Sequence, residues 1–283
     1  MARNKLSVID LQKMKEEGEP VVWVTAYDFI TARLAERAGM DMILVGDSLG
    51  MCIYGYDGTV PVTMDQCIYH CDAVRRGARN TFVIGDMPFG SYQISTEKAI
   101  ENAIRFHKEA GVDAVKLEGG ERVADVVRGI VDGGMLVMGH LGLTPQSSSA
   151  LGGFKAQGRT AETAMAVIRD ARVIHEAGAF SILIEAVPPE VTRIIREELP
   201  IPIYSIGAGI HADGQLMIVS DLVGHFEAFV PKFVKKYGNV AGEMSKSFES
   251  YVNDVKKGKF PGEEHAYSMM EGEFAKLLDE LRK

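Results

Sequence analysis

The chain lacks several features that would indicate a membrane or secreted protein. No stretch approaches the roughly 18 consecutive apolar residues that a membrane-spanning helix needs. Residues 1–18 contain no apolar core of the kind found in a signal peptide. Only three residues are cysteine, too few for a disulfide framework. We therefore expect a cytoplasmic protein without a membrane partner.

A surplus of basic residues is also missing. The 31 Lys and Arg residues are outnumbered by 39 Asp and Glu residues, which gives a formal net charge of −8 at pH 7. Because nucleic-acid-binding surfaces are usually basic, we expect no nucleic-acid partner. The hydrophobic content of 46% is ordinary for a globular protein and is enough to build a large core.

Six apolar runs of strand length, each ending in a polar residue or a Gly-rich tip, are the most informative feature present. They read ILVGDS, FVIGDMPFG, AVKLEGG, LVMGHLG, ILIEAVP and IYSIGAG, and candidate helices lie between them. Runs near residues 21–27 and 215–224 bring the number of βα units to about eight. Continuous apolar runs are typical of parallel strands buried on both faces.

The pattern predicts a (β/α)8 TIM barrel, for which about 250 residues is typical. An open doubly wound sheet is the alternative, but it would concentrate its functional loops near one switch point. No linker divides the chain, so we expect a single barrel domain over residues 1–283, with residues 225–283 as a helical C-terminal extension. Extra helices of this kind often pack against a neighbouring subunit, which favours a homo-oligomer.

The polar tips predict the position of the site, because the carboxyl ends of barrel strands converge on one mouth. Asp47 and Asp86 occupy equivalent positions after successive strands, and Glu118 follows the next strand. Carboxylates so placed suit Mg2+, which takes few protein carboxylates and completes its shell with water or substrate oxygens. The alternative for each acid alone is a helix cap or a partner for loop amides.

The other tips offer groups for substrate binding and proton transfer. Lys116 and Glu118 are two residues apart and so point the same way, into the barrel. Lys116 could pair with a substrate carboxylate, form a structural ion pair or form a Schiff base. His140 could bind a substrate oxygen, relay a proton or be purely structural. Glu185 ends a strongly apolar run, and desolvation suits a carboxylate to act as a general base, although a paired buried acid is the alternative.

Two Gly-rich segments complete the predicted mouth. Residues 152–158, GGFKAQG, form part of a long loop that could act as a lid. Residues 206–209, IGAG, could grip a phosphate, but we favour a Gly-rich wall.

Several longer motifs resemble the ketopantoate hydroxymethyltransferase family. They cover about residues 9–265 in order and include GDSLGM, YDGTVPVTM, GDMPFGSY, VKLEGG, GHLGLTPQS, GGFKAQGR and PKFVKKY. The resemblance implies a barrel of the phosphoenolpyruvate/pyruvate group. It also implies transfer of a hydroxymethyl group from 5,10-methylenetetrahydrofolate to 2-oxoisovalerate, and a decamer of two stacked pentameric rings.

The resemblance also implies roles for individual residues. Glu185 matches the proton acceptor. The positions of the Mg2+ ligands match Asp47, Asp86 and Glu118. The positions that contact the 2-oxoacid match Asp47, Ser48, Asp86 and Lys116, and His140 matches a His near the transferred group.

Four positions depart from the family pattern, namely Gly58, Ala156, Ala186 and Ser205, and none of them removes a named catalytic group. Ser205 is the departure that we expect to touch the pocket or a folate wall. Two other functions stay open. One is a Mg2+-dependent C–C or C–P lyase on the same barrel, although the loop over residues 142–158 lacks the Cys that such lyases often carry. The other is a non-catalytic paralogue.

Overall fold

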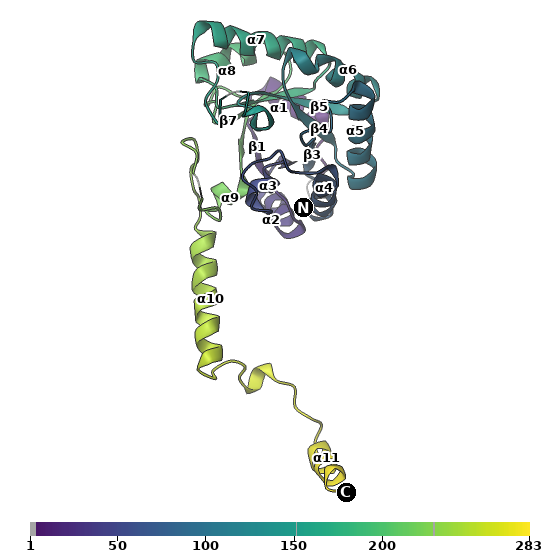
Figure 1. Ribbon diagram of the computed structural model, residues 1–283, viewed down its shortest axis with the longest axis vertical. Coiled ribbons are helices and arrows are strands. Elements are labelled where there is room, and N and C mark those ends of the chain that lie inside the picture. The colour runs from purple at the N-terminus through teal and green to yellow at the C-terminus, as the bar shows by residue number, and fades with distance from the viewer. Residues whose placement is uncertain (1–3, 151, 229) are drawn as a thin grey trace.

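A closed barrel of eight parallel strands forms the body of the protein (Figure 1). The computed structural model describes residues 4–150, 152–228 and 230–283. Each strand pairs with the next along the chain, and the last pairs with the first. The TIM-barrel prediction is confirmed. The strands are β1 Val21–Thr25, β2 Met42–Val45, β3 Phe82–Asp86, β4 Ala114–Glu118, β5 Leu136–Gly142, β6 Ser181–Glu185, β7 Ile203–Ile206 and β8 Gly214–Met217.

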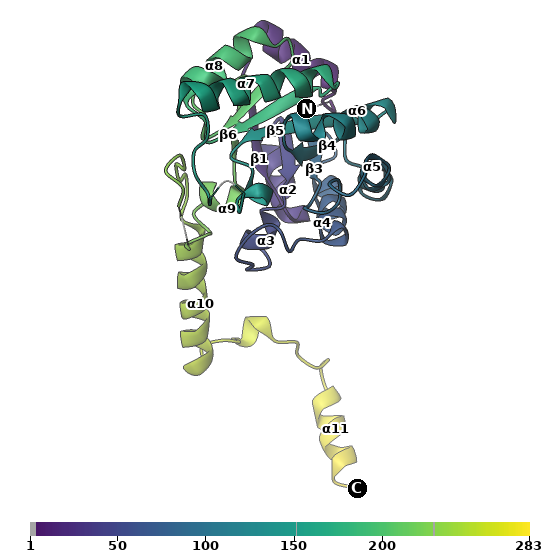
Figure 2. The ribbon, with the colours of Figure 1, turned by 45° about the horizontal axis from the view of Figure 1, so that its top comes forward.

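Helices surround the barrel, and side-chain caps fix where several of them begin (Figure 2). Ser95 and Thr160 accept backbone N–H groups at the starts of α5 and α7, as N-cap residues do. No helix in the described ranges is long and apolar enough to cross a membrane. The helices of the barrel are α1 Val8–Glu17, α2 Phe29–Ala38, α3 Leu49–Cys52, α4 Met64–Gly77, α5 Thr96–Ala110, α6 Ala124–Asp132, α7 Ala161–Glu176, α8 Pro189–Glu198 and α9 Val219–Leu222.

Two apolar cores hold the barrel together. One lies inside it, where Trp23 meets Tyr204 edge to face at a ring-centroid distance of 5.3 Å. Leu11 and Met14 of α1 join this inner core. The other core fills the layer between the strands and the surrounding helices. Because both faces of most strands are covered, those strands read as continuous apolar runs. The exceptions are β1 and β8, which expose Val22 and Gln215.

The alternation along each strand decides which polar residues face the barrel interior. Residues two apart on a strand point to the same side. Ala114 belongs to the inner core, so Lys116 and Glu118 also point inward, as the sequence predicted. By the same alternation the inward-facing Ile84, Met138 and Leu183 are followed by Asp86, His140 and Glu185.

The C-terminal extension is helical over less of its length than expected. Its helices are α10 Val240–Lys256, the 3-10 helix η3 Glu263–His265 and α11 Glu273–Leu281, and most of residues 225–239 and 257–272 is irregular. Proline and glycine interrupt these segments, at Pro231 and Gly238 in the first and from Gly258 to Gly272 in the second. Both α-helices project away from the barrel (Figures 1 and 2), and neither contains a buried residue.

Candidate active site

A cavity of about 370 Å³ opens at the carboxyl ends of the strands. Its floor is polar, and much of its remaining wall is apolar. All seven residues that the sequence predicted for the site line this cavity, although they lie up to 138 positions apart in the chain. They are Asp47, Ser48, Asp86, Lys116, Glu118, His140 and Glu185.

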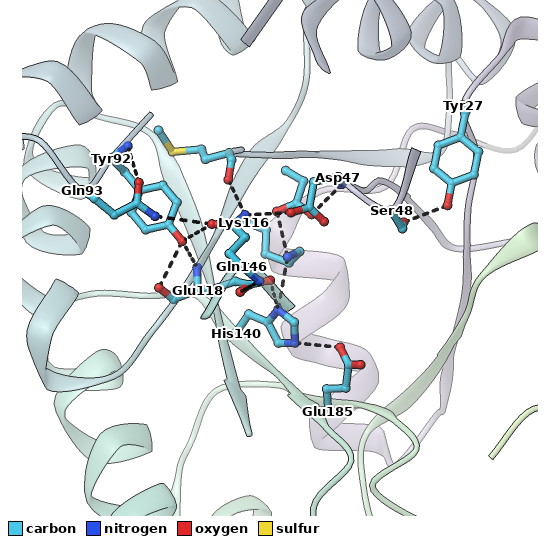
Figure 3. Close-up of polar contacts among 12 residues, drawn as sticks. Tyr27, Asp47, Ser48, Tyr92, Gln93, Lys116, Glu118, His140, Gln146 and Glu185 are labelled. Atoms are coloured by element: carbon cyan, nitrogen blue, oxygen red, sulfur yellow. Dashed lines mark hydrogen bonds and ion pairs between the residues drawn. The ribbon is translucent and has the colours of Figure 1, made fainter. Parts of the chain in front are cut away.

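A chain of polar contacts crosses the floor from β3 to β6 (Figure 3). The Lys116 Nζ lies 2.8 Å from Asp86 Oδ1 and 3.2 Å from His140 Nδ1. His140 Nε2 lies 3.2 Å from Glu185 Oε2. Four side chains from four successive strands are therefore linked in one line. The structure bears out an ion pair for Lys116 and places Glu185 within reach of His140.

The electrostatics of this line assign the protons on His140. Burial lowers the pKa of Lys116, but the carboxylates of Asp86, Glu118 and Asp47 outweigh it and raise that pKa. Lys116 is thus an ammonium and donates to Nδ1. Burial and the charge of Lys116 lower the pKa of His140, so its ring is neutral near pH 7. A neutral ring that accepts at Nδ1 carries its hydrogen on Nε2, on the side of the ring that faces Glu185.

Three buried carboxylates surround the one lysine. Burial raises the pKa of Asp47, and the charge of Glu118 adds to this. The pKa of Asp86 is raised well above its usual value, again chiefly by burial. Burial raises the pKa of Glu118 to about 7, against the pull of Lys116. If all three acids were ionised, they would carry more negative charge than Lys116 alone can neutralise.

This surplus suits a divalent cation, which would favour the ionised form of the acids. Asp47 and Asp86 lie together, since the Asp47 N–H donates to Asp86 Oδ2 at 3.0 Å. Two carboxylates are enough for Mg2+. Within the part of the chain that the structure describes, no three acidic, His or Cys side chains are grouped closely enough to hold a metal. Glu118 as a third direct ligand stays a prediction.

Gln146 and Tyr92 are site residues that the sequence reasoning did not identify. Gln146 Nε2 donates to Asp47 Oδ2 at 2.9 Å, and the Gln146 backbone N–H donates to Glu118 Oε2 at 3.0 Å. The Tyr92 hydroxyl donates to Gln146 Oε1 at 2.6 Å and accepts from the Glu118 N–H at 3.1 Å. These two buried residues hold two of the three acids. Both lie inside quoted motifs, GDMPFGSY and GHLGLTPQS, but neither is a strand tip.

Backbone constraints fix the position of Glu185. The next residue, Ala186, has a φ of 48°, which an L-residue with a side chain adopts only at a cost. Gly142 has a φ of 90°, and a Cβ there would lie 2.3 Å from the Glu185 carbonyl oxygen. Glycine at position 142 therefore allows β5 and β6 to approach closely beside the predicted base.

The IGAG segment is explained by packing. A Cβ at Gly207 would lie 2.4 Å from the ring of Phe233, and a Cβ at Gly209 would lie 2.6 Å from Pro189. Ile206 of this segment lines the cavity, and the Gly-rich wall stays a prediction. The expectation for Ser205 was wrong, since it is fully buried, does not line the cavity and accepts the Ala208 N–H at 3.0 Å. On β7 it alternates with the inward-facing Tyr204 and Ile206, so it points outward.

The predicted lid loop borders the same cavity. Phe154 and Ala156 line it, and the Gln157 N–H donates to the Ala186 carbonyl at 3.0 Å. Closure of the loop stays a prediction. Ser48, on the opposite side, lies 2.9 Å from the Tyr27 hydroxyl, which fixes the orientation of its side chain.

Comparison with known proteins decides the family. The family model for ketopantoate hydroxymethyltransferase matches residues 5–263. The chain belongs to this family. It is 61% identical over 284 residues to the 3-methyl-2-oxobutanoate hydroxymethyltransferase of Alkaliphilus metalliredigens, covering 100% of both chains. It is 51% identical to the enzyme of the same name from Moorella thermoacetica, covering 94% of this chain and 98% of that one. The chain is thus a hydroxymethyltransferase by family.

Solved structures support the fold at much lower identity. A phosphonopyruvate hydrolase in complex with oxalate and Mg2+ matches 98% of this chain and 96% of its own, with a TM-score of 0.60 and 14% identity. Such a likeness shows the barrel alone.

Proposed function

We propose that this enzyme transfers a hydroxymethyl group from 5,10-methylenetetrahydrofolate to 2-oxoisovalerate and so forms ketopantoate, a step of pantothenate biosynthesis. The single observation that carries the proposal is the line of Asp86, Lys116, His140 and Glu185 across the cavity floor, in a chain of this family. A cationic side chain and a proton acceptor on opposite sides of His140 suit deprotonation next to a carbonyl.

Asp47 and Asp86 would hold Mg2+, with Glu118 as a third acid beside it. Bound Mg2+ would act as a Lewis acid that polarises the keto group of the oxoacid and acidifies the neighbouring C–H. The surplus of buried carboxylates supports this assignment. The phosphonopyruvate hydrolase of similar fold is known in complex with oxalate and Mg2+, and that protein's ligands fit the proposal.

Side chains of the protein would carry out the other steps of the reaction. Ser48 and the Lys116 ammonium would bind oxygens of the 2-oxoacid, and Lys116 would stabilise the negative charge that develops there. Glu185 would take the proton from C3. The carbon nucleophile would then form a C–C bond to the methylene carbon of the folate. Both C–N bonds of that carbon, to N5 and N10, would break, water would supply the hydroxyl oxygen, and the protons from C3 and from the water would end on N5 and N10. His140 would hold Glu185 through Nε2 and could carry a proton to or from it.

The test is a turnover assay of the purified protein with 2-oxoisovalerate, 5,10-methylenetetrahydrofolate and Mg2+. The proposal expects ketopantoate and tetrahydrofolate in equal amounts. Absence of both, with cleavage of a 2-oxoacid substrate instead, would support a lyase. Absence of any turnover, together with intact binding of the oxoacid, would support the non-catalytic paralogue.

We also propose that the enzyme is a homo-oligomer. The C-terminal extension exposes large apolar side chains that the barrel of the same chain does not cover, among them Phe248 at 61% and Leu281 at 74% exposed. A second copy of the chain could cover them. Light scattering of the full chain and of a chain ending at residue 239 would test this, since a monomeric full chain contradicts it.

A further inference from the structure

An acidic side chain away from the predicted metal site lines the same cavity. Asp221 belongs to α9, the short helix that follows β8, and is only 6% exposed. None of the roles considered above uses it. A buried carboxylate is expensive unless a partner satisfies it. Apart from Asp221 itself and Lys232, the residues between 216 and 233 that line the cavity are apolar, so the presence of Asp221 calls for an explanation.

Hydrogen bonds to three other segments hold α9 in place. The Val219 N–H donates to the Thr25 hydroxyl at 2.9 Å, at the end of β1. The Ser220 hydroxyl donates to Cys52 Sγ at 3.2 Å, which ties α9 to α3. The Tyr237 N–H donates to the Leu222 carbonyl at 2.7 Å. The carboxylate of Asp221 is therefore presented from a fixed position and does not depend on a mobile loop.

The carboxylate itself is left without a donor. Among the residues that the structure describes, no side chain or backbone N–H donates a hydrogen bond to it, whereas the neighbouring acids Asp47 and Asp86 both accept one. Burial raises the pKa of Asp221, and the nearby charge of Lys236 opposes that rise only in part. A ligand with N–H donors would supply what the protein does not.

The surroundings of Asp221 suit a flat ring. Phe226 and Phe233 line the cavity from the segment after α9, and Phe154 lines it from the predicted lid loop. Phe233 packs so closely on Gly207 that any larger residue at position 207 would displace its ring. Ile218 on the same wall is apolar. Aromatic and aliphatic walls with one oriented carboxylate are typical of sites for planar heterocycles.

We propose that Asp221 binds the 2-amino-4-oxo edge of the pteridine ring of the folate co-substrate, with the ring lying against the aromatic wall. This rests on the proposed function, which supplies the folate. The exocyclic amine and the adjacent ring N–H are two parallel donors, and a carboxylate accepts such a pair in a bidentate, charge-assisted fashion. The methylene-bearing side of the ring would then lie toward the predicted base, since Glu185 lines the same cavity.

The Asp221→Asn variant tests the assignment. Asparagine has the same shape as aspartate, but its amide NH2 would face one of the two N–H donors of the pteridine, so that one hydrogen bond would be lost. The matched control is Asp132→Asn, an exposed carboxylate at the end of α6 that lies outside the cavity. Three quantities are measured on the full chain: KM for each substrate, affinity for a tetrahydropterin without the glutamate tail by calorimetry, and exchange of the C3 proton of 2-oxoisovalerate into heavy water without folate.

The expected result is a rise of about 10- to 100-fold in KM for the folate and in Kd for the tetrahydropterin, the range for losing one charge-assisted hydrogen bond. KM for the oxoacid and the exchange rate should stay at wild-type values, as they should for the control. Folate KM and pterin affinity unchanged in Asp221→Asn would overturn the inference. A loss of C3 proton exchange as large as the loss of folate affinity would also overturn the inference, because it would indicate that Asp221 has a structural role.

Failure of the proposed function would look different. The wild-type protein would then exchange the C3 proton but form no ketopantoate. In that case the calorimetry still decides the inference: binding of the tetrahydropterin by the wild type and its loss in Asp221→Asn would uphold it, and no binding by the wild type would overturn it.

Discussion

The Glu118→Gln substitution should make the stability of the metal-free protein less dependent on pH. Glu118 is buried among Asp86, Asp47 and Lys116, and burial raises its pKa from the usual 4.5 to about 7. Between these two values the folded protein binds a proton that the unfolded chain releases. Stability from this group is therefore fully present below about pH 4.5 and is lost as the pH rises through 7.

The structure sets the size of the effect. A tenfold difference in proton affinity corresponds to about 1.4 kcal/mol, so the rise in the pKa of Glu118 corresponds to about 3 kcal/mol of unfolding free energy. About 2 to 3 kcal/mol of this is lost between pH 5 and pH 8. Glutamine is a neutral mimic of the protonated acid, and its carbonyl can keep the hydrogen bond from the Gln146 N–H. The variant should match the wild type near pH 5 and exceed its unfolding free energy at pH 8.

Urea unfolding with excess chelator, at one protein concentration and at four pH values from 5 to 8, would measure this difference. Glu121→Gln is the control, since Glu121 is exposed and lies three residues away on the same side of the barrel. Parallel pH profiles for the wild type and Glu118→Gln would refute the reasoning, because the burial of Glu118 would then carry no proton-linked cost.

Three further substitutions test the geometry of the site. Glu185→Gln should retain binding of 2-oxoisovalerate by calorimetry but slow exchange of the C3 proton at least about 100-fold; exchange at the wild-type rate would exclude Glu185 as the base. Tyr92→Phe removes the hydroxyl that bonds the Gln146 side chain and the Glu118 N–H. It should lower the unfolding free energy measured with urea by about 1–3 kcal/mol, whereas no change would mean that water replaces the hydroxyl. Gly142→Ala should lower the melting temperature more than Gly134→Ala, because both have a positive φ but only the first Cβ meets a neighbour; equal losses would show that the contact with Glu185 relaxes.

Much of the site could be predicted from residue order alone. Apolar runs that end in Asp86, Lys116, Glu118 and Glu185 identify strands, and parallel strands in a barrel bring such ends together whatever lies between them. The same logic fails for residues that reach the site from loops. Gln146 lies in the short 3-10 helix Pro145–Ser147 and Tyr92 in an irregular segment, and nothing in their spacing along the chain indicates that their side chains meet.

The sequence by itself determined the barrel and the end of the barrel that bears the site, because continuous apolar runs that end in polar residues identify buried parallel strands. It also determined which side chains point inward, because side chains alternate between the two faces along a strand. It overestimated the helix in the C-terminal extension and misplaced Ser205. Only the tertiary structure decided that Lys116 donates to Nδ1 of His140, that Gln146 fixes Asp47, and that Asp221 finds no hydrogen-bond donor among the described residues on a largely apolar wall. Each of these depends on distances between side chains from different strands and loops, which the order of residues does not specify.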